Sequence, residues 1–317
     1  MTVQTPASGH PLPAAEGPAP GAGGHYGRGV AMVLLAGVCL SSGGLLVRSI
    51  EAADGWQILF YRAVAFTLTA FSFTLWRHRG RWPSAYLAIG WPGLIGAVAL
   101  GIGFAAYLFA LLHTTVANLA FILSAGPFCA ALLGWLVLRE RVPLFTWLAM
   151  TVALGGIALM LLDGLGGGQM TGNLIALIAP LTFAVMLIAI RFRADRDMTP
   201  ILPLAGVVAA LLALPMVESF QLSPRDLVLA LLLGSVQIGA GFILITLGAR
   251  WVPAAQVALL SLTETVLAPT WVWLLFDERP TTLAFVGGLI VLGAVVGEGL
   301  RGLRRPKRSE SPQKPAL

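Results

Sequence analysis

Residues 135–141, WLVLRER, return 138 residues later in the chain as residues 273–279, WLLFDER. At the same offset, three spaced glycines before this stretch match three others: Gly96, Gly101 and Gly103 match Gly234, Gly239 and Gly241. Ala117 also matches Ala255, and Gly155 matches Gly293. Matches of Trp, Glu, Arg and spaced Gly are hard to obtain by chance in an apolar chain. The sequence therefore predicts an internal repeat.

The composition is that of a membrane protein. Of the 317 residues, 57% are hydrophobic and only 11% are charged, and the mean hydropathy is +0.86. Soluble domains carry about 25% charged residues, so a chain this apolar needs lipid around its outer surface. The net charge of +6 does not indicate nucleic-acid binding, because the basic residues lie in short loops and at the end of the chain.

Ten apolar segments are long enough to cross a membrane as helices, which need about 20 residues each. Because the connections are short, neighbouring helices should run antiparallel. The expected ranges are Val30–Ile50, Trp56–Trp76, Trp91–Leu112, Val116–Leu138, Leu144–Leu162, Leu174–Phe192, Pro200–Val217, Leu227–Ala249, Ala254–Phe276 and Leu283–Leu300.

The basic residues predict the orientation, since cytoplasmic loops carry an excess of Lys and Arg. With the N-terminus in the cytoplasm, 16 of the 20 basic residues lie inside. Only Arg48, Arg225 and Arg279 lie outside, and Arg62 lies within the second segment. We therefore expect both termini to be cytoplasmic.

Each half holds five segments, and this odd number forces the halves to insert in opposite senses. Inverted repeats are typical of alternating-access transporters, whose substrate site lies near the midplane between the halves, although channels also use them. The expected organisation is a disordered cytoplasmic tail (1–28), a first repeat (29–162), a periplasmic linker (163–173), a second repeat (174–300) and a basic cytoplasmic tail (301–317).

Several stretches together carry a family resemblance: GWQILFYR (55–62), LSAGP (123–127), LGWLVLRE (133–140), LTETVLAP (262–269) and WVWLLFDE (271–278). Their order and spacing, over nearly all of the chain except the tails, resemble the EamA-type members of the drug/metabolite transporter superfamily. One departure is that the family often has Glu-Pro in the ninth segment, where this chain has Glu264-Thr265. A kink is therefore expected at Pro269.

The resemblance implies a ten-helix secondary transporter of the bacterial inner membrane rather than an enzyme, with the fifth and tenth helices at the periphery. Its leading substrate class is amino acids or similar amphipathic compounds, which it would export. Drugs, nucleosides and sugars stay open as substrates, because a fold alone does not define function. A membrane-embedded lipid enzyme and a channel stay open as other classes of protein.

Ionisable side chains inside a membrane segment cost several kcal/mol, so each is a candidate site residue. Glu264 lies about ten residues into the ninth segment, where burial disfavours its charged form. It could carry a proton or bind a substrate amine, or it could be a structural acid. Arg62 lies roughly two turns from the outer face and could hold a substrate carboxylate with its fork of donors, or pair within the protein.

Smaller polar and aromatic residues could complete a cavity or only join helices: Ser41, Ser42, Tyr107, Asn118, Ser124, Gln237, Gln256, Ser261, Thr263 and Trp271. No metal-binding or phosphate-binding motif is present, so we expect no metal and no cofactor. The expected partners are a small-molecule substrate and membrane lipid. Gly293 and Gly297 form a GxxxG pattern that could support a homodimer, which leaves monomer and homodimer open.

Overall fold

The computed structural model describes residues 22–79, 82–139, 142–167, 169–193, 196–248, 251–252 and 254–304. Within these ranges every regular element is a helix and no strand occurs. The first half contains α1 (Ala22–Arg48), α2 (Gly55–His78), α3 (Trp82–Ala88), α4 (Gly90–His113), α5 (Val116–Ser124), α6 (Gly126–Leu138) and α7 (Leu144–Gly167). The second contains α8 (Met170–Ala176), α9 (Ile178–Phe192), α10 (Ile201–Ala213), η1 (Leu214–Met216), α11 (Pro224–Leu232), η2 (Leu233–Ala240), α12 (Gly241–Gly248), α13 (Ala254–Phe276) and α14 (Thr282–Arg304).

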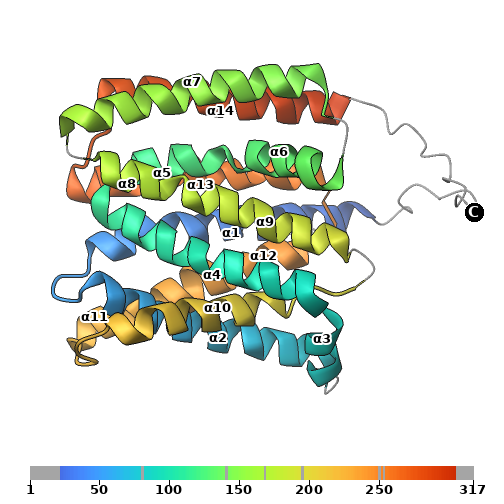
Figure 1. Cartoon of the computed structure of the whole chain (residues 1–317), viewed down its shortest axis with the longest axis vertical. Coiled ribbons are helices and arrows are strands. Elements are labelled where there is room, and N and C mark those ends of the chain that lie inside the picture. Colours follow the sequence, from blue (N-terminus) through green and yellow to red (C-terminus); the bar gives the residue numbers. More distant parts are fainter. Residues whose placement is uncertain are drawn as a thin grey trace, which may run out of the picture.

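Seven helical stretches of the described chain are long and apolar enough to cross a membrane. Three shorter stretches, Ile201–Met216, Leu260–Phe276 and Thr282–Gly297, are apolar as well. All of them fall on the predicted segments, so the prediction of an all-helical membrane protein is confirmed. The helices lie side by side along one axis, with the start of α1 and the end of α14 at the same end of the bundle (Figure 1).

Large apolar side chains cover the outside of the bundle. Leu68, Leu211 and Leu274 are 62%, 60% and 68% exposed, respectively. A soluble protein rarely leaves so many large apolar side chains in contact with water, whereas lipid solvates them.

Three of the membrane-length stretches are interrupted. α5 gives way to α6 at Ala125, where Pro127 occupies the first turn of α6, because proline is tolerated at a helix start but not in its interior. α8 gives way to α9 at Leu177. Between α11 and α12 the chain forms η2, a π-helix, a wide turn that is frequent at functional sites. α13, in contrast, continues through Pro269 as one helix.

Helices extend further than the membrane segments predicted from the sequence. α1 begins at Ala22, so the expectation of a disordered tail over residues 1–28 is wrong for residues 22–28, and residues 1–21 lie outside the described part. α7 continues to Gly167 and α8 begins at Met170, so most of the expected linker 163–173 is helical. Hydropathy ends a segment at the first polar residue, but extending an existing helix costs far less than starting one. α3 was not predicted.

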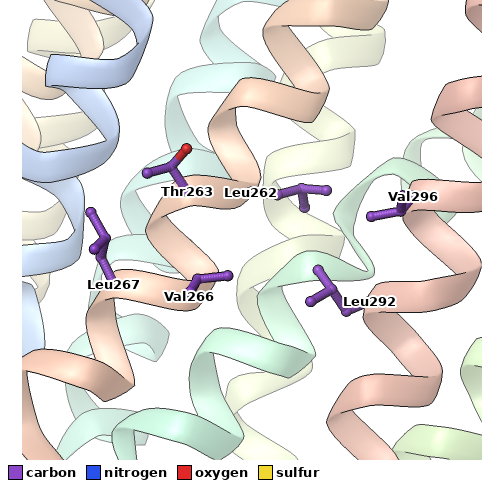
Figure 2. A pocket seen from close by; sticks show the side chains of 6 residues that line it. All are labelled: Leu262, Thr263, Val266, Leu267, Leu292 and Val296. Atoms are coloured by element: carbon purple, nitrogen blue, oxygen red, sulfur yellow. The ribbon is translucent and has the colours of Figure 1, made fainter.

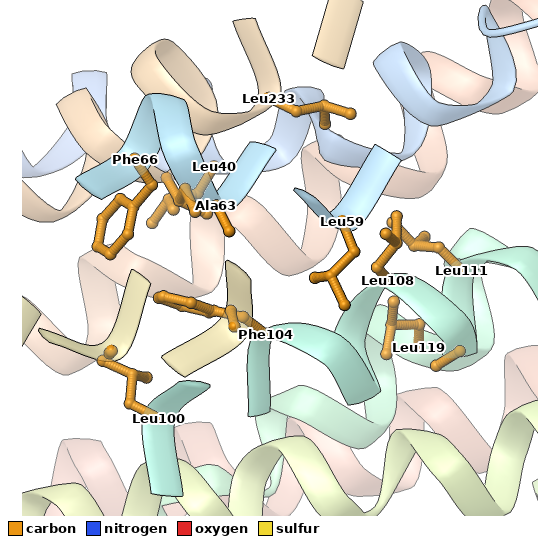
Figure 3. Close-up of a cluster of buried hydrophobic side chains, with 14 of the residues drawn as sticks. Leu40, Leu59, Ala63, Phe66, Leu100, Phe104, Leu108, Leu111, Leu119 and Leu233 are labelled. Atoms are coloured by element: carbon orange, nitrogen blue, oxygen red, sulfur yellow. The ribbon is translucent and has the colours of Figure 1, made fainter. Parts of the chain in front are cut away.

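α7 and α14 pack against each other at one edge of the bundle (Figure 1). Their main chains approach closely at Gly156 and Gly287, where a Cβ on either glycine would collide with the carbonyl oxygen of the other. A small apolar cluster that includes Met150, Ile157 and Val291 lies at this contact. The larger core lies elsewhere, between α1, α2, α4, α5, α10 and η2 (Figure 3). α7 packs mainly on α14, and α14 packs also on α5 and α13.

Candidate functional site

Arg62 is the centre of the candidate site. It projects from α2 and is only 2% exposed. Its Nη1 donates to the carbonyl oxygen of Phe104 at 3.2 Å, and its Nη2 donates to Oε1 of Gln237 at 3.4 Å. Within the described part of the chain, its Nε has no hydrogen-bond partner and no carboxylate forms an ion pair with it. The guanidinium is therefore buried with only weak neutral partners.

Gln237 links Arg62 to α1. It lies on the π-helix η2 and is 1% exposed. While its Oε1 faces Arg62, its Nε2 donates to the carbonyl oxygen of Leu40 at 3.3 Å. The helix comes this close to α2 because Gly234 has no side chain, and a Cβ there would collide with the main-chain oxygen of Arg62.

Two aromatic rings from α4 flank the guanidinium. The Cζ atom of Arg62 lies 5.0 Å from the ring centroid of Tyr107 and 5.8 Å from that of Phe104. Such distances allow a cation–π attraction, which strengthens when the cation is desolvated. The phenol oxygen of Tyr107 packs against Gly43 of α1, where a Cβ would displace it.

Glu264 brings a second ionisable group to the same region from α13. Tyr107 lies close enough to interact electrostatically with both Glu264 and Arg62. Among the described residues, the half-buried carboxylate of Glu264 has no hydrogen-bond or ion-pair partner. The structure therefore brings the two ionisable residues singled out in the sequence into the neighbourhood of the same tyrosine.

The contact between α1 and α13 adds a further polar pair, about two turns along α13 from Glu264. Nε1 of Trp271 donates to Oγ of Ser41 at 3.0 Å, and Ser41 is fully buried. Ser42 instead bonds within its own helix, to the carbonyl oxygen of Cys39 at 2.6 Å.

The sequence did not reveal the roles of the Leu40 carbonyl and of Phe104, because an apolar residue gives no signal that its main chain will accept a hydrogen bond.

Other predicted residues lie away from Arg62. Asn118 is fully buried in a polar cluster, where its Nδ2 lies 3.2 Å from Thr114 Oγ1, 3.1 Å from Gln169 Oε1 and 3.2 Å from Asn173 Oδ1. Its side chain joins α4, α5 and α8 at one end of the bundle, as expected of an interhelical hydrogen bond. The side chain of Gln256, its repeat equivalent, lies outside the described part.

The remaining hydroxyl groups bond within their helices or face apolar surroundings. Ser124 donates to the carbonyl oxygen of Phe121 and Ser261 to that of Val257. Thr263 lies near Gly37 of α1 and on the wall of a hollow between α13 and α14 (Figure 2). The walls of this hollow carry no charged side chain: Leu262, Thr263, Val266, Leu267, Leu292 and Val296. The hollow suits an apolar chain better than a polar substrate.

No group of three His, Cys, Asp or Glu residues in the described part of the chain could hold a metal ion. The chemistry that Arg62, Tyr107 and Glu264 offer is recognition of charge. A fixed cation, a phenol and a carboxylate can orient a ligand that carries complementary charges.

Comparisons with known proteins cover both halves of the chain. The sequence model of the EamA-like transporter family matches residues 27–162 and 170–297. The Pseudopaline exporter CntI of Pseudomonas aeruginosa (strain UCBPP-PA14) is 28% identical over 280 residues, which cover 84% of this chain and 94% of that protein. The Uncharacterized protein PA1977 of another strain of that species is 26% identical over 287 residues, with 86% and 98% covered. A solved crystal structure is similar to this chain with a TM-score of 0.59 and 18% sequence identity. The match covers 88% of this chain and 99% of the chain in that structure, and at this identity it supports only a common fold.

Proposed function

Because this chain belongs to the EamA-like transporter family, we propose that it is a secondary transporter that exports a small amphipathic metabolite, with amino acids as the leading class. The observation that carries the proposal is the buried guanidinium of Arg62, which no carboxylate neutralises in the described part of the chain. A buried charge without a partner costs several kcal/mol. A ligand anion would remove that cost when it binds.

A substrate carboxylate fits the donors that Arg62 leaves available. Nε is free of partners among the described residues, and the bonds of the two Nη atoms are long, at 3.2 and 3.4 Å. Guanidinium groups bind carboxylates through two parallel N–H···O bonds. We therefore assign Arg62 to the carboxylate of the substrate, with Tyr107 and Gln237 as neighbours that fix its position.

We assign Glu264 to the positively charged group of the substrate. Its carboxylate has no partner in the described structure and lies near Tyr107. It can bind a substrate amine or carry a proton, and both roles need a carboxylate that no internal cation has already neutralised. An amino acid or a similar zwitterion offers both groups that the site would recognise.

We further propose that all ten apolar helical stretches cross the bacterial inner membrane, in two inverted repeats with both termini in the cytoplasm. The placement of Arg77, Arg139 and Arg191 at helix ends opposite Arg48 supports this orientation. The two halves would rock about the site between them, exposing it to each side in turn. Alkaline phosphatase fused to the C-terminus should be inactive, and an active periplasmic fusion would contradict the orientation.

The test of transport is counterflow. Purified protein is reconstituted in liposomes loaded with an unlabelled amino acid, and uptake of the labelled compound is compared with uptake by protein-free liposomes. We expect saturable exchange of one class of substrate. Pseudopaline belongs in the panel, because relatives at 28% identity are exporters of that compound, together with cationic drugs, nucleosides and sugars.

A pair of variants ties the transport to the site. Arg62→Gln should raise KM for a carboxylate substrate by at least about tenfold, because a hydrogen bond to a charged group contributes roughly 1.5–3 kcal/mol. Ser235→Ala is the matched control, since its hydroxyl bonds only within its own helix two residues from Gln237. Exchange that does not saturate would indicate a channel, and no exchange of any compound would argue against the proposal.

A further inference from the structure

Arg48 ends α1 and makes three hydrogen bonds to groups outside its own helix. Its Nε donates to Oε2 of Glu278 at 2.8 Å, its Nη1 to the carbonyl oxygen of Leu111 at 2.7 Å, and its Nη2 to that of Thr114 at 2.9 Å. The two carbonyls belong to the last turn of α4 and its C-cap. A helix leaves its final carbonyls without internal partners and concentrates negative charge there, which favours a cation.

Glu278 completes this arrangement from the other half of the chain. It lies two residues beyond the end of α13. Its Oε1 accepts a hydrogen bond at 2.8 Å from the main-chain N–H of Val116, the first residue of α5. The start of a helix has free N–H groups and partial positive charge, so it favours a carboxylate. We call Arg48, Glu278 and the three main-chain groups they bind the Arg48–Glu278 clamp.

The clamp joins the two halves of the transporter at one end of the bundle. Arg48, α4 and α5 belong to the first half and Glu278 to the second. The two side chains are 25% and 21% exposed. A partly exposed ion pair is weak enough to break and re-form, because water can solvate both charges when they separate. The clamp is therefore suited to a contact that opens.

The same helix connects the clamp to the candidate site. Leu40, which receives the hydrogen bond of Gln237, and Ser41, which receives that of Trp271, lie eight and seven residues before Arg48 on α1. At 1.5 Å per helical residue, the clamp lies roughly 12 Å along the axis from these contacts. Between them, Gly44 packs so closely on Val116 that a Cβ would lie 2.7 Å from its methyl groups. α1 and α5 are thus in direct contact between the clamp and the candidate site.

A second contact between the halves at this end has a different character. Asp226 of α11 is 1% exposed and accepts main-chain hydrogen bonds from Glu51 at 3.2 Å and Ala52 at 3.1 Å. A buried carboxylate that loses such partners is left uncompensated, so this joint resists opening. The structure therefore has one joint that resists opening and one clamp that can open at the same end.

We propose that the Arg48–Glu278 clamp is the gate at this end, which is the periplasmic end in the proposed orientation, and that it opens when the end of α13 moves away from α1, α4 and α5. This inference rests on the proposed transporter function. The gate closes the site to the periplasm when Arg48 holds Glu278 and the end of α4. Substrate release on that side requires the bonds of Glu278 to Arg48 and to Val116 to break.

Distance measurement between spin labels tests the gate without a substrate. Labels are attached at Ser49→Cys and Arg279→Cys in a Cys39→Ala/Cys129→Ala background, and the protein is reconstituted in liposomes. We expect two populations of label distance. Arg48→Ala should raise the ratio of the longer to the shorter population roughly fivefold, which corresponds to losing a partly exposed pair and its hydrogen bonds.

Three further variants separate the clamp from unspecific effects. Glu278→Gln should shift the populations in the same direction, and Arg48→Lys should give an intermediate shift, because a lysine keeps the charge but cannot reach three acceptors as a planar fork. Arg225→Ala removes the exposed pair with Glu51 at the same end, whose side chains are 59% and 69% exposed, and should leave the ratio unchanged.

The outcomes distinguish the gate from the transporter function. A single distance population that Arg48→Ala and Glu278→Gln leave unchanged would overturn the gate, even if the wild type shows saturable counterflow. Two distance populations whose ratio shifts as expected support the gate. If the wild type then exchanged no compound of the panel, only the proposed transporter function would be contradicted. An equal shift in Arg225→Ala would overturn the specific role of the clamp.

Discussion

Arg77 at the end of α2 and Asp197 between α9 and α10 form an ion pair, with 2.6 Å between Nε and Oδ2. It joins the two halves at the end of the bundle opposite Arg48 (Figure 1). The main-chain N–H of Thr199 donates to the other oxygen at 3.0 Å. Burial alone would raise the pKa of Asp197, but hydrogen bonds from Thr199 and Arg77 outweigh it and hold the pKa below its usual value.

Asp197→Asn should therefore lower the free energy of unfolding near neutral pH, by about 1 kcal/mol because the pair is partly exposed. A carboxyl group whose pKa is lowered in the folded state stabilises the protein above its unfolded pKa, and this contribution is lost as the pH falls through the folded pKa. The difference between wild type and variant should thus close below about pH 4. Chemical unfolding in detergent micelles at several pH values measures it.

Asp277→Asn is the matched control for this prediction. Asp277 also pairs with an arginine, Arg279, but the two side chains are 77% and 69% exposed. Its backbone has a φ of 52°, which asparagine tolerates as well as aspartate. A pH-dependent loss of stability as large as that of Asp197→Asn would show that the effect does not arise from the Arg77–Asp197 pair.

The helices could be predicted from the sequence because a single physical cost determines them. An unpaired main-chain polar group in lipid costs several kcal/mol, so an apolar run of membrane length must be a helix. The cost of a charge in lipid likewise makes Arg62 and Glu264 stand out in the sequence as candidate site residues. The extensions of α1 and α7 beyond the apolar segments were missed, since helix propagation there does not depend on hydropathy.

The partners of polar side chains could not be predicted in the same way. Arg48 and Glu278 lie 230 positions apart, and the repeat singled out Glu278 without indicating what it binds. Asn118 was expected to line a cavity or to join helices, and the structure places it with Thr114 and Asn173. Such contacts depend on how helices rotate and cross, which a hydropathy pattern does not determine.

Gly234→Ala tests the close approach of η2 to α2. A Cβ at this position would collide with the carbonyl oxygen of Arg62 and the Cβ of Ala65, so the two helices must separate. Overpacking of this kind typically costs about 1–3 kcal/mol, and the melting temperature in detergent should fall. Gly293→Ala is the control, because nothing lies within 4 Å of a Cβ there. A variant as stable as the wild type would contradict the close contact at Gly234.

Gln237→Glu tests whether Arg62 is kept available for a ligand. The new carboxylate would stand where Oε1 of Gln237 lies, 3.4 Å from Nη2 of Arg62, and would neutralise the guanidinium inside the protein. We expect unchanged or higher thermal stability and a KM for a carboxylate substrate raised at least about tenfold, because an internal charge pair competes with the substrate. Gln237→Met, similar in size and uncharged, controls for shape.

If KM for the carboxylate substrate stayed at the wild-type value in Gln237→Glu, Arg62 would not be its receptor. A lower thermal stability of Gln237→Glu would have a different meaning. It would show that the hydrogen bond from Nε2 of Gln237 to the carbonyl oxygen of Leu40, which the carboxylate cannot make, matters more for the fold than the neutralised charge.

Glu264→Gln separates binding of an amine from transport of a proton. The amide keeps the shape and the acceptor oxygen of the carboxylate but can take up no proton, so transport should lose its dependence on the pH gradient. Counterflow, which needs no gradient, should persist if the substrate binds mainly through Arg62. Uptake into liposomes with and without an imposed pH gradient measures the coupling.

Glu218→Gln is the control for this prediction. It removes an exposed carboxylate between η1 and α11 and should leave both counterflow and the dependence on the pH gradient unchanged. Coupling in Glu264→Gln equal to that of the wild type would remove Glu264 from the proton pathway and leave it at most a ligand for the substrate amine.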